Sequence, residues 1–160
     1  MNKTNKTNAM RLMDAAKISY RAVEYEYDES DLGGEHVAAV TGMNPDQVFK
    51  TLVARGEKQG ILVFCIPVSC TLDLKKAAHA AGDKKVELIH MKELLGLTGY
   101  IRGGCSPVGM KKKYPTFMDE TAELYDEIAV SGGARGLQIV LNPLKLMEYA
   151  DITAADLVEY

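Results

Sequence analysis

The stretch of residues 52–68 reads Leu-Val-Ala-Arg-Gly-Glu-Lys-Gln-Gly-Ile-Leu-Val-Phe-Cys-Ile-Pro-Val and carries the strongest folding signal of the chain. Residues 61–68 are almost continuously apolar and rich in β-branched side chains, which is typical of a strand buried in the middle of a sheet. Residues 52–54 predict a second strand, and residues 56–60 form a polar turn between the two. We therefore expect the centre of the sheet to lie here.

The segments around this centre alternate between strand and helix patterns. Further strands are predicted at residues 20–27, 86–89, 116–118, 127–130 and 137–141. Helices are predicted at residues 9–16, 35–40, 72–81 and 91–95, with a helical turn at 121–125 and a β-plus-helix tail at 152–160. Asn8 is expected to cap the first helix. Asn44-Pro45 and Asn142-Pro143 each predict a further helix start, because Asn is favoured at the cap and Pro at the first helical position.

Most connections between these segments are too short for the crossovers that parallel strands require. The expected fold is a single α/β domain with a mixed, mostly antiparallel, barrel-like sheet surrounded by helices. The chain has 160 residues, of which 47% are apolar and 26% charged, and this composition excludes disordered, collagenous and disulfide-scaffold classes. Residues 1–7 are expected to be a flexible segment that precedes a domain at residues 8–160.

The charge and cysteine content limit the function classes. The formal net charge is −3, so any contact with nucleic acid must be local and not a broad basic coat. No uncharged apolar run approaches the roughly 20 residues that span a bilayer, and the N-terminus lacks the apolar region of a signal peptide. Cys65, Cys70 and Cys105 form no Cys-x-x-Cys motif. We therefore expect a reduced, cytoplasmic protein without a membrane segment.

Histidine and cysteine offer little chemistry by pattern. His36, His79 and His90 lie in separate elements with no ligand spacing, so capping or surface roles are favoured over a metal site. A nucleophilic cysteine needs a partner base, and the sequence pairs none with a histidine. Cys105 is the cysteine with a suggestive position, because it lies in a glycine-rich loop.

Two glycine-rich loops and one lysine are the more informative features. The first glycine loop (residues 103–109) and the second (residues 131–136) can bring backbone N–H groups close to a ligand, or can be ordinary turns. Both follow or connect strands, so together they could form two walls of one pocket. Lys50 is expected at the end of a short helix, where its side chain either reaches the surface or points into a pocket. Arg102 and the lysine pairs and triplet at 75–76, 84–85 and 111–113 are local basic clusters that would suit phosphate contacts.

Three motifs in order are similar to the YbaK family of aminoacyl-tRNA deacylases, the free-standing relatives of the editing domain of bacterial prolyl-tRNA synthetases. They are Phe49-Lys50-Thr51-Leu52, Gly103-Gly104-x-Ser106-Pro107-x-Gly109 and Ser131-Gly132-Gly133-x-Arg135-Gly136. The resemblance runs from about Thr7 to the C-terminus. It implies a mixed α/β fold and trans-editing of mischarged Cys-tRNA(Pro), and also of Cys-tRNA(Cys). Cysteine and proline are close in size, so a second hydrolytic site corrects what the synthetase cannot exclude.

The resemblance further implies a reaction without cofactor or metal, in which the thiol of the bound cysteinyl group attacks its own ester. It makes Lys50 the essential residue that orients the terminal ribose or phosphate, and it places backbone groups of Gly103 and Gly104 at the carbonyl oxygen. The substrate-binding positions implied are Tyr25, Thr51, Ser106, Pro107, Gly109, Ser131 and Gly132. Lys111 and Lys112 are expected to contact tRNA, and prolyl-tRNA synthetase is the expected partner.

Four positions depart from the family pattern. Cys105 and Gly33 replace an aliphatic and an aromatic residue near the expected pocket, Ala134 replaces a lysine, and Gln138 stands where some members carry Asp. Two other functions stay open at this point. The protein could edit another aminoacyl-tRNA, such as Ala-tRNA(Pro), or it could be a non-catalytic module that binds tRNA or a nucleotide.

Overall fold

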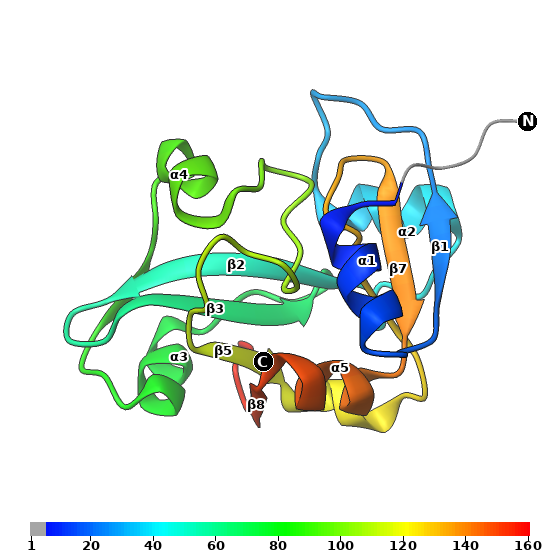
Figure 1. Ribbon diagram of the computed structural model, residues 1–160. Coiled ribbons are helices and arrows are strands. Elements are labelled where there is room, and N and C mark those ends of the chain that lie inside the picture. The colour runs from blue at the N-terminus through cyan, green and yellow to red at the C-terminus, as the bar shows by residue number, and fades with distance from the viewer. Residues whose placement is uncertain (1–5) are drawn as a thin grey trace, which may run out of the picture.

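Two β-sheets meet at the beginning of strand β2 in the computed structural model, which describes residues 6–160 (Figure 1). The larger sheet has the strand order β4 (Val86–Leu88), β2 (Phe49–Gly56), β3 (Gly60–Pro67), β5 (Thr116–Asp119) and β8 (Ile152–Ala155). The smaller sheet has the order β1 (Tyr20–Glu24), β7 (Leu137–Leu141) and β6 (Ile128–Ser131). This is the predicted α/β class with mixed sheets, but over residues 6–160 the sheets do not close into a barrel.

The predicted central hairpin is confirmed. Strands β2 and β3 pair antiparallel along their whole length, with Phe49 opposite Pro67 and Gly56 opposite Gly60. Strand β3 then pairs parallel with β5, and β5 parallel with β8. Because β3 has a neighbour on each side and packing on both faces, its side chains from Val63 to Ile66 are completely buried.

Helices cover these sheets from several sides (Figure 1). The α-helices are α1 (Asn8–Ala15), α2 (Gly34–Thr41), α3 (Leu74–Ala81), α4 (Leu94–Thr98) and α5 (Pro143–Ala150), and 3-10 turns lie at Met91–Glu93 and Glu120–Leu124. Asn142 caps α5 as predicted, by accepting a hydrogen bond from the Lys145 N–H. The cap of α1 is Thr7 and not the predicted Asn8, because the Thr7 hydroxyl accepts from the Met10 N–H.

Three further sequence predictions are wrong in detail. Asn44-Pro45 begins no helix, since Asn44 Oδ1 accepts from the Asp46 N–H in a tight turn and β2 starts soon after. Lys50 therefore lies in a strand and not at a helix end. Strand β1 stops at Glu24 instead of residue 27, and the C-terminal tail contains β8 but no helix. The flexible segment predicted at residues 1–7 falls mainly on residues 1–5, which lie outside the described residues.

A seam joins the two sheets beside the site. Val48 forms a parallel bridge with Ala129 of β6, and the Ala129 N–H donates to the Gln47 carbonyl at 2.8 Å. On the other side, the Val48 carbonyl accepts from the Val68 N–H at 2.8 Å. A small apolar cluster, which we call the seam cluster, packs around this bridge and consists of Val37, Ala38, Val48, Val68, Ala129 and Val140. It fixes where the end of β2 meets the smaller sheet.

Candidate functional site

A cavity of about 350 Å³ lies along β2, next to the seam. This volume is in the range of small-molecule sites, and most of the lining is apolar. The lining comes from β2, β7, the end of β6, the residue after β3, α2 with the residues before it, the segment 88–94, and the first glycine loop with the residue before it. Its residues are Leu32, Gly33, Gly34, Val37, Val48, Phe49, Lys50, Thr51, Leu52, Val53, Val68, Leu88, Ile89, Met91, Leu94, Arg102, Gly103, Cys105, Ser131 and Gln138.

The cavity follows an edge of β2 that is free of a neighbouring strand over a short stretch. Strand β4 pairs with β2 only from Ala54 onward, and the seam bridge lies at Val48. The Val53 carbonyl accepts from the Ile89 N–H on this edge. Since the peptide groups of alternate residues in a strand point to the same edge, the N–H and C=O of Thr51 also face the cavity side. The sheet thus presents backbone donors and acceptors to a ligand.

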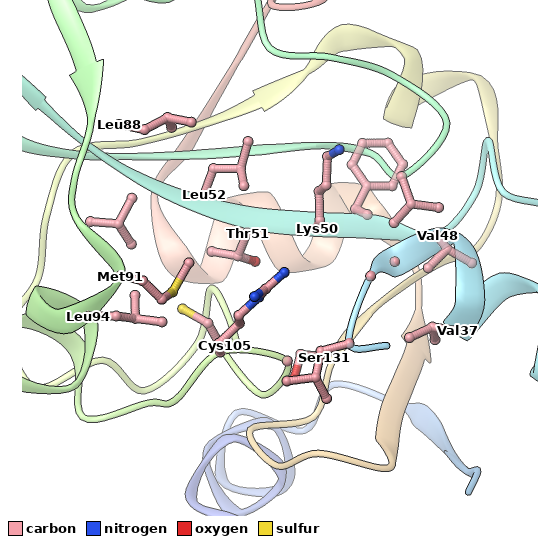
Figure 2. Close-up of a pocket in the computed structure, with 18 of the residues that line it drawn as sticks. Val37, Val48, Lys50, Thr51, Leu52, Leu88, Met91, Leu94, Cys105 and Ser131 are labelled. Carbon is pink, nitrogen blue, oxygen red and sulfur yellow. The ribbon is translucent and has the colours of Figure 1, made fainter. Parts of the chain in front are cut away.

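Lys50 supplies a positive charge without a partner. Figure 2 shows Lys50 and Leu52 on one face of β2 and Thr51 on the other, on the side of Cys105 and Ser131. The Lys50 side chain is half-buried, and no hydrogen bond or ion pair engages its Nζ within residues 6–160. Arg102, which is exposed, likewise has no side-chain partner there. The lining includes no Asp or Glu, so the cavity carries two cations and no counter-charge.

The first glycine loop enters the site through a tight turn at residues 101–104. The Gly104 N–H donates to the Ile101 carbonyl at 2.9 Å, and Gly103 has a φ of 85°, which is a conformation that glycine adopts without strain. The Arg102 carbonyl accepts from Arg135 Nε at 2.8 Å. The Arg102 carbonyl and the Gly103 N–H belong to one peptide group, and in a trans peptide these two groups point in opposite directions. By binding the carbonyl, Arg135 therefore directs the Gly103 N–H away from the Arg135 side chain. That N–H has no partner among the described residues.

The two glycine loops pack against each other, which is the arrangement the sequence suggested. A Cβ at Gly104 would lie 3.1 Å from both the carbonyl carbon of Ala134 and the amide nitrogen of Arg135. Gly103 and Cys105 line the cavity from the first loop, and Ser131 lines it from the second. The predicted residues Lys50, Thr51, Gly103 and Ser131 are therefore brought together in one site.

Several predicted site residues do not line the cavity. They are Tyr25, Gly104, Ser106, Pro107, Gly109, Gly132, Lys111 and Lys112. Tyr25 packs against the seam cluster, which includes the lining residues Val37, Val48 and Val68. Ser106 is fully buried, and its Oγ accepts from the Val108 N–H, so it shapes the loop. Gly132 allows close approach of Leu137, whose Cγ would lie 2.8 Å from an added Cβ.

Burial makes the cysteines near the site unsuited to nucleophilic attack. Cys105 is 9% exposed, and burial raises the pKa of its thiol to about 12, against a smaller lowering effect of a hydrogen bond with Thr98. Burial likewise raises the pKa of Cys65 to about 12. Both thiols are protonated at neutral pH, whereas a cysteine nucleophile acts as the thiolate. Catalysis by Cys65 or Cys105 is thus disfavoured on physical grounds.

One lysine in each of the other basic clusters has a structural partner. Lys76 Nζ contacts Asp156 Oδ1 at 3.1 Å and lies 4.1 Å from the centre of the Tyr160 ring, so it holds the C-terminal segment. Lys85 pairs with Glu87 and Lys113 with Asp151. Lys111 and Lys112 are exposed and carry no ion pair within residues 6–160. Of the predicted phosphate contacts, Arg102 is the one at the cavity.

A search of residues 6–160 finds no cluster of three or more His, Cys, Asp or Glu side chains suited to a metal ion. The same residues contain no helix that is both long and apolar enough to cross a membrane.

Gln138 and the apolar walls are the parts of the site that sequence reasoning did not find. Gln138 enters the sequence analysis only as a departure from the family pattern. The lining residues Val37, Val68 and Leu88 belong to three distant segments with ordinary core patterns. No local signal distinguishes a side chain that walls a cavity from one that fills a core.

Residues 33–149 match the family model of the aminoacyl-tRNA editing domain, and this range includes all the lining residues except Leu32. The chain belongs to the aminoacyl-tRNA editing domain family. The membership confirms the resemblance to the YbaK family that the three motifs indicated, and with it the class of an aminoacyl-tRNA editing enzyme.

Individual editing-domain proteins match over nearly their whole length. The chain is 47% identical, over 94% of its length and 95% of the relative's, to "Putative Cys-tRNA(Pro)/Cys-tRNA(Cys) deacylase EbsC" of Enterococcus faecalis. A crystal structure of "a putative trans-editing enzyme for prolyl tRNA synthetase" has a TM-score of 0.80 and 27% identity, and covers 98% of this chain and 100% of its own. The crystal structure of "hypothetical protein APE2540" has a TM-score of 0.84 at 23% identity, with 93% and 97% covered, and supports the fold.

Proposed function

We propose that this protein is a trans-editing deacylase that cleaves the ester of mischarged Cys-tRNA(Pro), and also of Cys-tRNA(Cys). The observation that carries the proposal is a cavity with unpaired cations and with no side chain fit to attack an ester. The 47% identity to the Enterococcus faecalis relative, whose name includes both substrates, supports the same assignment. The cavity volume of about 350 Å³ limits the site to a small aminoacyl group and part of the terminal nucleoside.

The chemistry that suits this lining is attack by the substrate itself. The lining contains no His, Asp or Glu to act as a general base, and its one cysteine is protonated at neutral pH. The thiol sulfur of the bound cysteinyl group attacks its own carbonyl carbon and loses its proton to solvent. The carbon–oxygen bond to the ribose then breaks, the ribose oxygen takes up a proton, and a cyclic thiolactone leaves.

The protein then has two tasks, which are to hold the substrate in attack geometry and to stabilise the oxyanion. We assign the first to Lys50, which binds the terminal ribose or phosphate beside the ester. We assign the second to the Gly103 N–H, which is unpartnered and is oriented by Arg135. Gly104 is not retained as an oxyanion donor, because its N–H is already bonded to Ile101.

The recognition of the rest of the tRNA is assigned to surface lysines and to a partner. Lys111 and Lys112 follow the first glycine loop and form no ion pair with any of residues 6–160, so we propose that they contact the acceptor end. With a net charge of −3, the protein alone is expected to bind tRNA weakly. We propose that prolyl-tRNA synthetase supplies the selectivity for tRNA(Pro).

A panel of substrates tests the proposal. Release of labelled amino acid is measured from Cys-, Ala- and Ser-tRNA(Pro), with and without prolyl-tRNA synthetase. We expect Cys-tRNA to react at least about 100-fold faster than the others, because an intramolecular nucleophile is lost with the thiol. Equal rates for Cys and Ala would instead indicate a water-based editing enzyme for another residue. Binding without any release would indicate a non-catalytic module.

A further inference from the structure

Gln138 is a buried polar side chain that the fold does not use. It is 5% exposed, it lines the cavity, and within residues 6–160 neither polar atom of its carboxamide has a hydrogen-bond partner. Its Oε1 is the buried side-chain polar atom of the described residues that is left without a partner. Buried polar groups in proteins are almost always hydrogen-bonded, so an orphan of this kind needs an explanation.

The surroundings of Gln138 argue against a structural role on energetic grounds. It is the one polar residue of β7, whose other side chains are Leu137, Ile139, Val140 and Leu141, all of them buried. An apolar side chain of similar length would fit this strand without leaving an amide unpaired. Gln138 therefore destabilises the folded protein, and the structure shows a cavity beside it in which a ligand could relieve that cost.

The depth of Gln138 indicates which part of the substrate it meets. Gln138 and its cross-strand neighbour Ser131 are buried polar lining residues, at 5% and 8% exposed, whereas Arg102 of the same lining is exposed. The body of a tRNA must remain outside the protein. The phosphate and ribose therefore lie toward Arg102, and the aminoacyl group reaches the buried end near Gln138.

We propose that Gln138 Oε1 accepts a hydrogen bond from the α-amino group of the bound aminoacyl moiety, an inference that rests on the proposed function. The atom of the carboxamide that is both completely buried and without a partner is Oε1, which is an acceptor. On an aminoacyl ester the α-amino group is the strong donor, since the carbonyl is only an acceptor and a thiol donates weakly. The lining has no carboxylate that could hold the amino group in an ion pair.

Gln138 is thus a specificity-determining residue, and the substrate class that it selects has a free α-amino group. Acylation of that nitrogen, as in peptidyl-tRNA, would replace the small donor by a bulky group at the buried end of the cavity. The position accordingly favours aminoacyl esters over N-acylated ones.

The test combines Gln138→Met with a change in the substrate. Deacylation is measured with Cys-tRNA(Pro) and with the same tRNA carrying a 3-mercaptopropionyl ester, which keeps the thiol but lacks the amino group. We expect the variant to lose about 10-fold in kcat/KM on Cys-tRNA and less than about twofold on the desamino substrate. Its Tm should equal or exceed that of the wild type, because an unpaired amide is removed. Gln138→Glu, which retains an acceptor, should keep the preference for the amino substrate.

An equal loss on both substrates, or a lower Tm for Gln138→Met, would overturn the inference in favour of a structural role. Binding measurements separate this outcome from a failure of the proposed function. The probe is 3′-cysteinylamino-3′-deoxyadenosine, in which an amide replaces the ester. If no variant releases amino acid but this probe binds about 10-fold more weakly to Gln138→Met than to the wild type, the function fails and the inference stands. If the probe binds both proteins equally, the inference fails whatever the turnover.

Discussion

The two ends of the β2–β3 hairpin differ in whether their polar groups have hydrogen-bond partners. At the turn, the Asp83 carboxylate accepts hydrogen bonds from the N–H groups of Lys58, Gln59 and Lys84, at 3.0, 2.8 and 2.7 Å. At the other end, Lys50 and, across the cavity, Gln138 have no partner in residues 6–160. Paired polar groups stabilise a fold, and unpaired ones cost stability unless a ligand completes them. We therefore propose that the turn end of the hairpin stabilises the fold and that the other end binds the ligand.

The largest effect should come from removing the unpaired cation. Lys50→Met keeps the aliphatic stem and deletes the charge, and we expect deacylation of Cys-tRNA(Pro) to fall about 100-fold or more because the ester is no longer held in place. The Tm should not fall, since no partner of Lys50 is lost. Lys58→Met is the matched control at the other end of the same hairpin, and it should retain full activity. Retained activity in Lys50→Met would remove this lysine from the site.

A smaller effect is expected from the residue that orients the loop. Arg135→Met keeps the stem that packs near Gly103 and removes the bond from Nε to the Arg102 carbonyl. The Gly103 N–H is then less well fixed, and kcat should fall roughly 10-fold while KM changes little. Arg135 also pairs with Glu29 at 3.6 Å, so Glu29→Gln is the control that breaks this pair alone. If both variants lose activity equally, the ion pair with Glu29 supports activity, and the hydrogen bond from Arg135 Nε to the Arg102 carbonyl does not.

A substitution at the turn end of the hairpin should leave deacylation unchanged and lower the thermal stability instead. Hydrogen bonds from the Gln59 and neighbouring backbone N–H groups hold the pKa of Asp83 below its ordinary value of 3.8. A depressed pKa in the folded state means that the stabilisation is present above that ordinary value and is lost as the pH falls through the folded pKa. Asp83→Asn should lower the Tm at pH 7 by a few degrees, and the difference from wild type should shrink as the pH falls below 3.8 and through the lowered folded-state pKa of Asp83. Deacylation at 25 °C should be unchanged, and a large loss of activity would contradict the division between the two ends.

Two similar dipeptides show how far the sequence predicts the fold. Asn142-Pro143 begins a helix and Asn44-Pro45 does not, although their local chemistry is the same. The difference is tertiary, because the residues after Asn44 pair along the whole of β3 and pack in the seam, and this outweighs the local helix preference. Buried strands such as β3 were predictable, since their apolar runs are explicit in the sequence.

The site was predictable where a motif marks it and not elsewhere. Lys50, Thr51, Gly103 and Ser131 lie in the three motifs and meet at the cavity. Gln138 and the apolar walls come from segments whose patterns indicate only burial. The engagement of the Gly104 N–H by Ile101 also depends on a turn geometry that composition does not specify.

The seam between the sheets has a consequence for the range of amino acids that this fold accommodates. The lining takes Phe49 to Val53 from β2 in the larger sheet and Ser131 and Gln138 from β6 and β7 in the smaller sheet, so part of it depends on the spacing between the two sheets. The bridge from Val48 to Ala129 fixes that spacing, and Ala129 is completely inaccessible to solvent. A backbone contact outside the lining therefore holds Ser131 and Gln138 in place relative to β2, and a relative that accepts bulkier amino acids could differ at this bridge while every lining residue stayed the same.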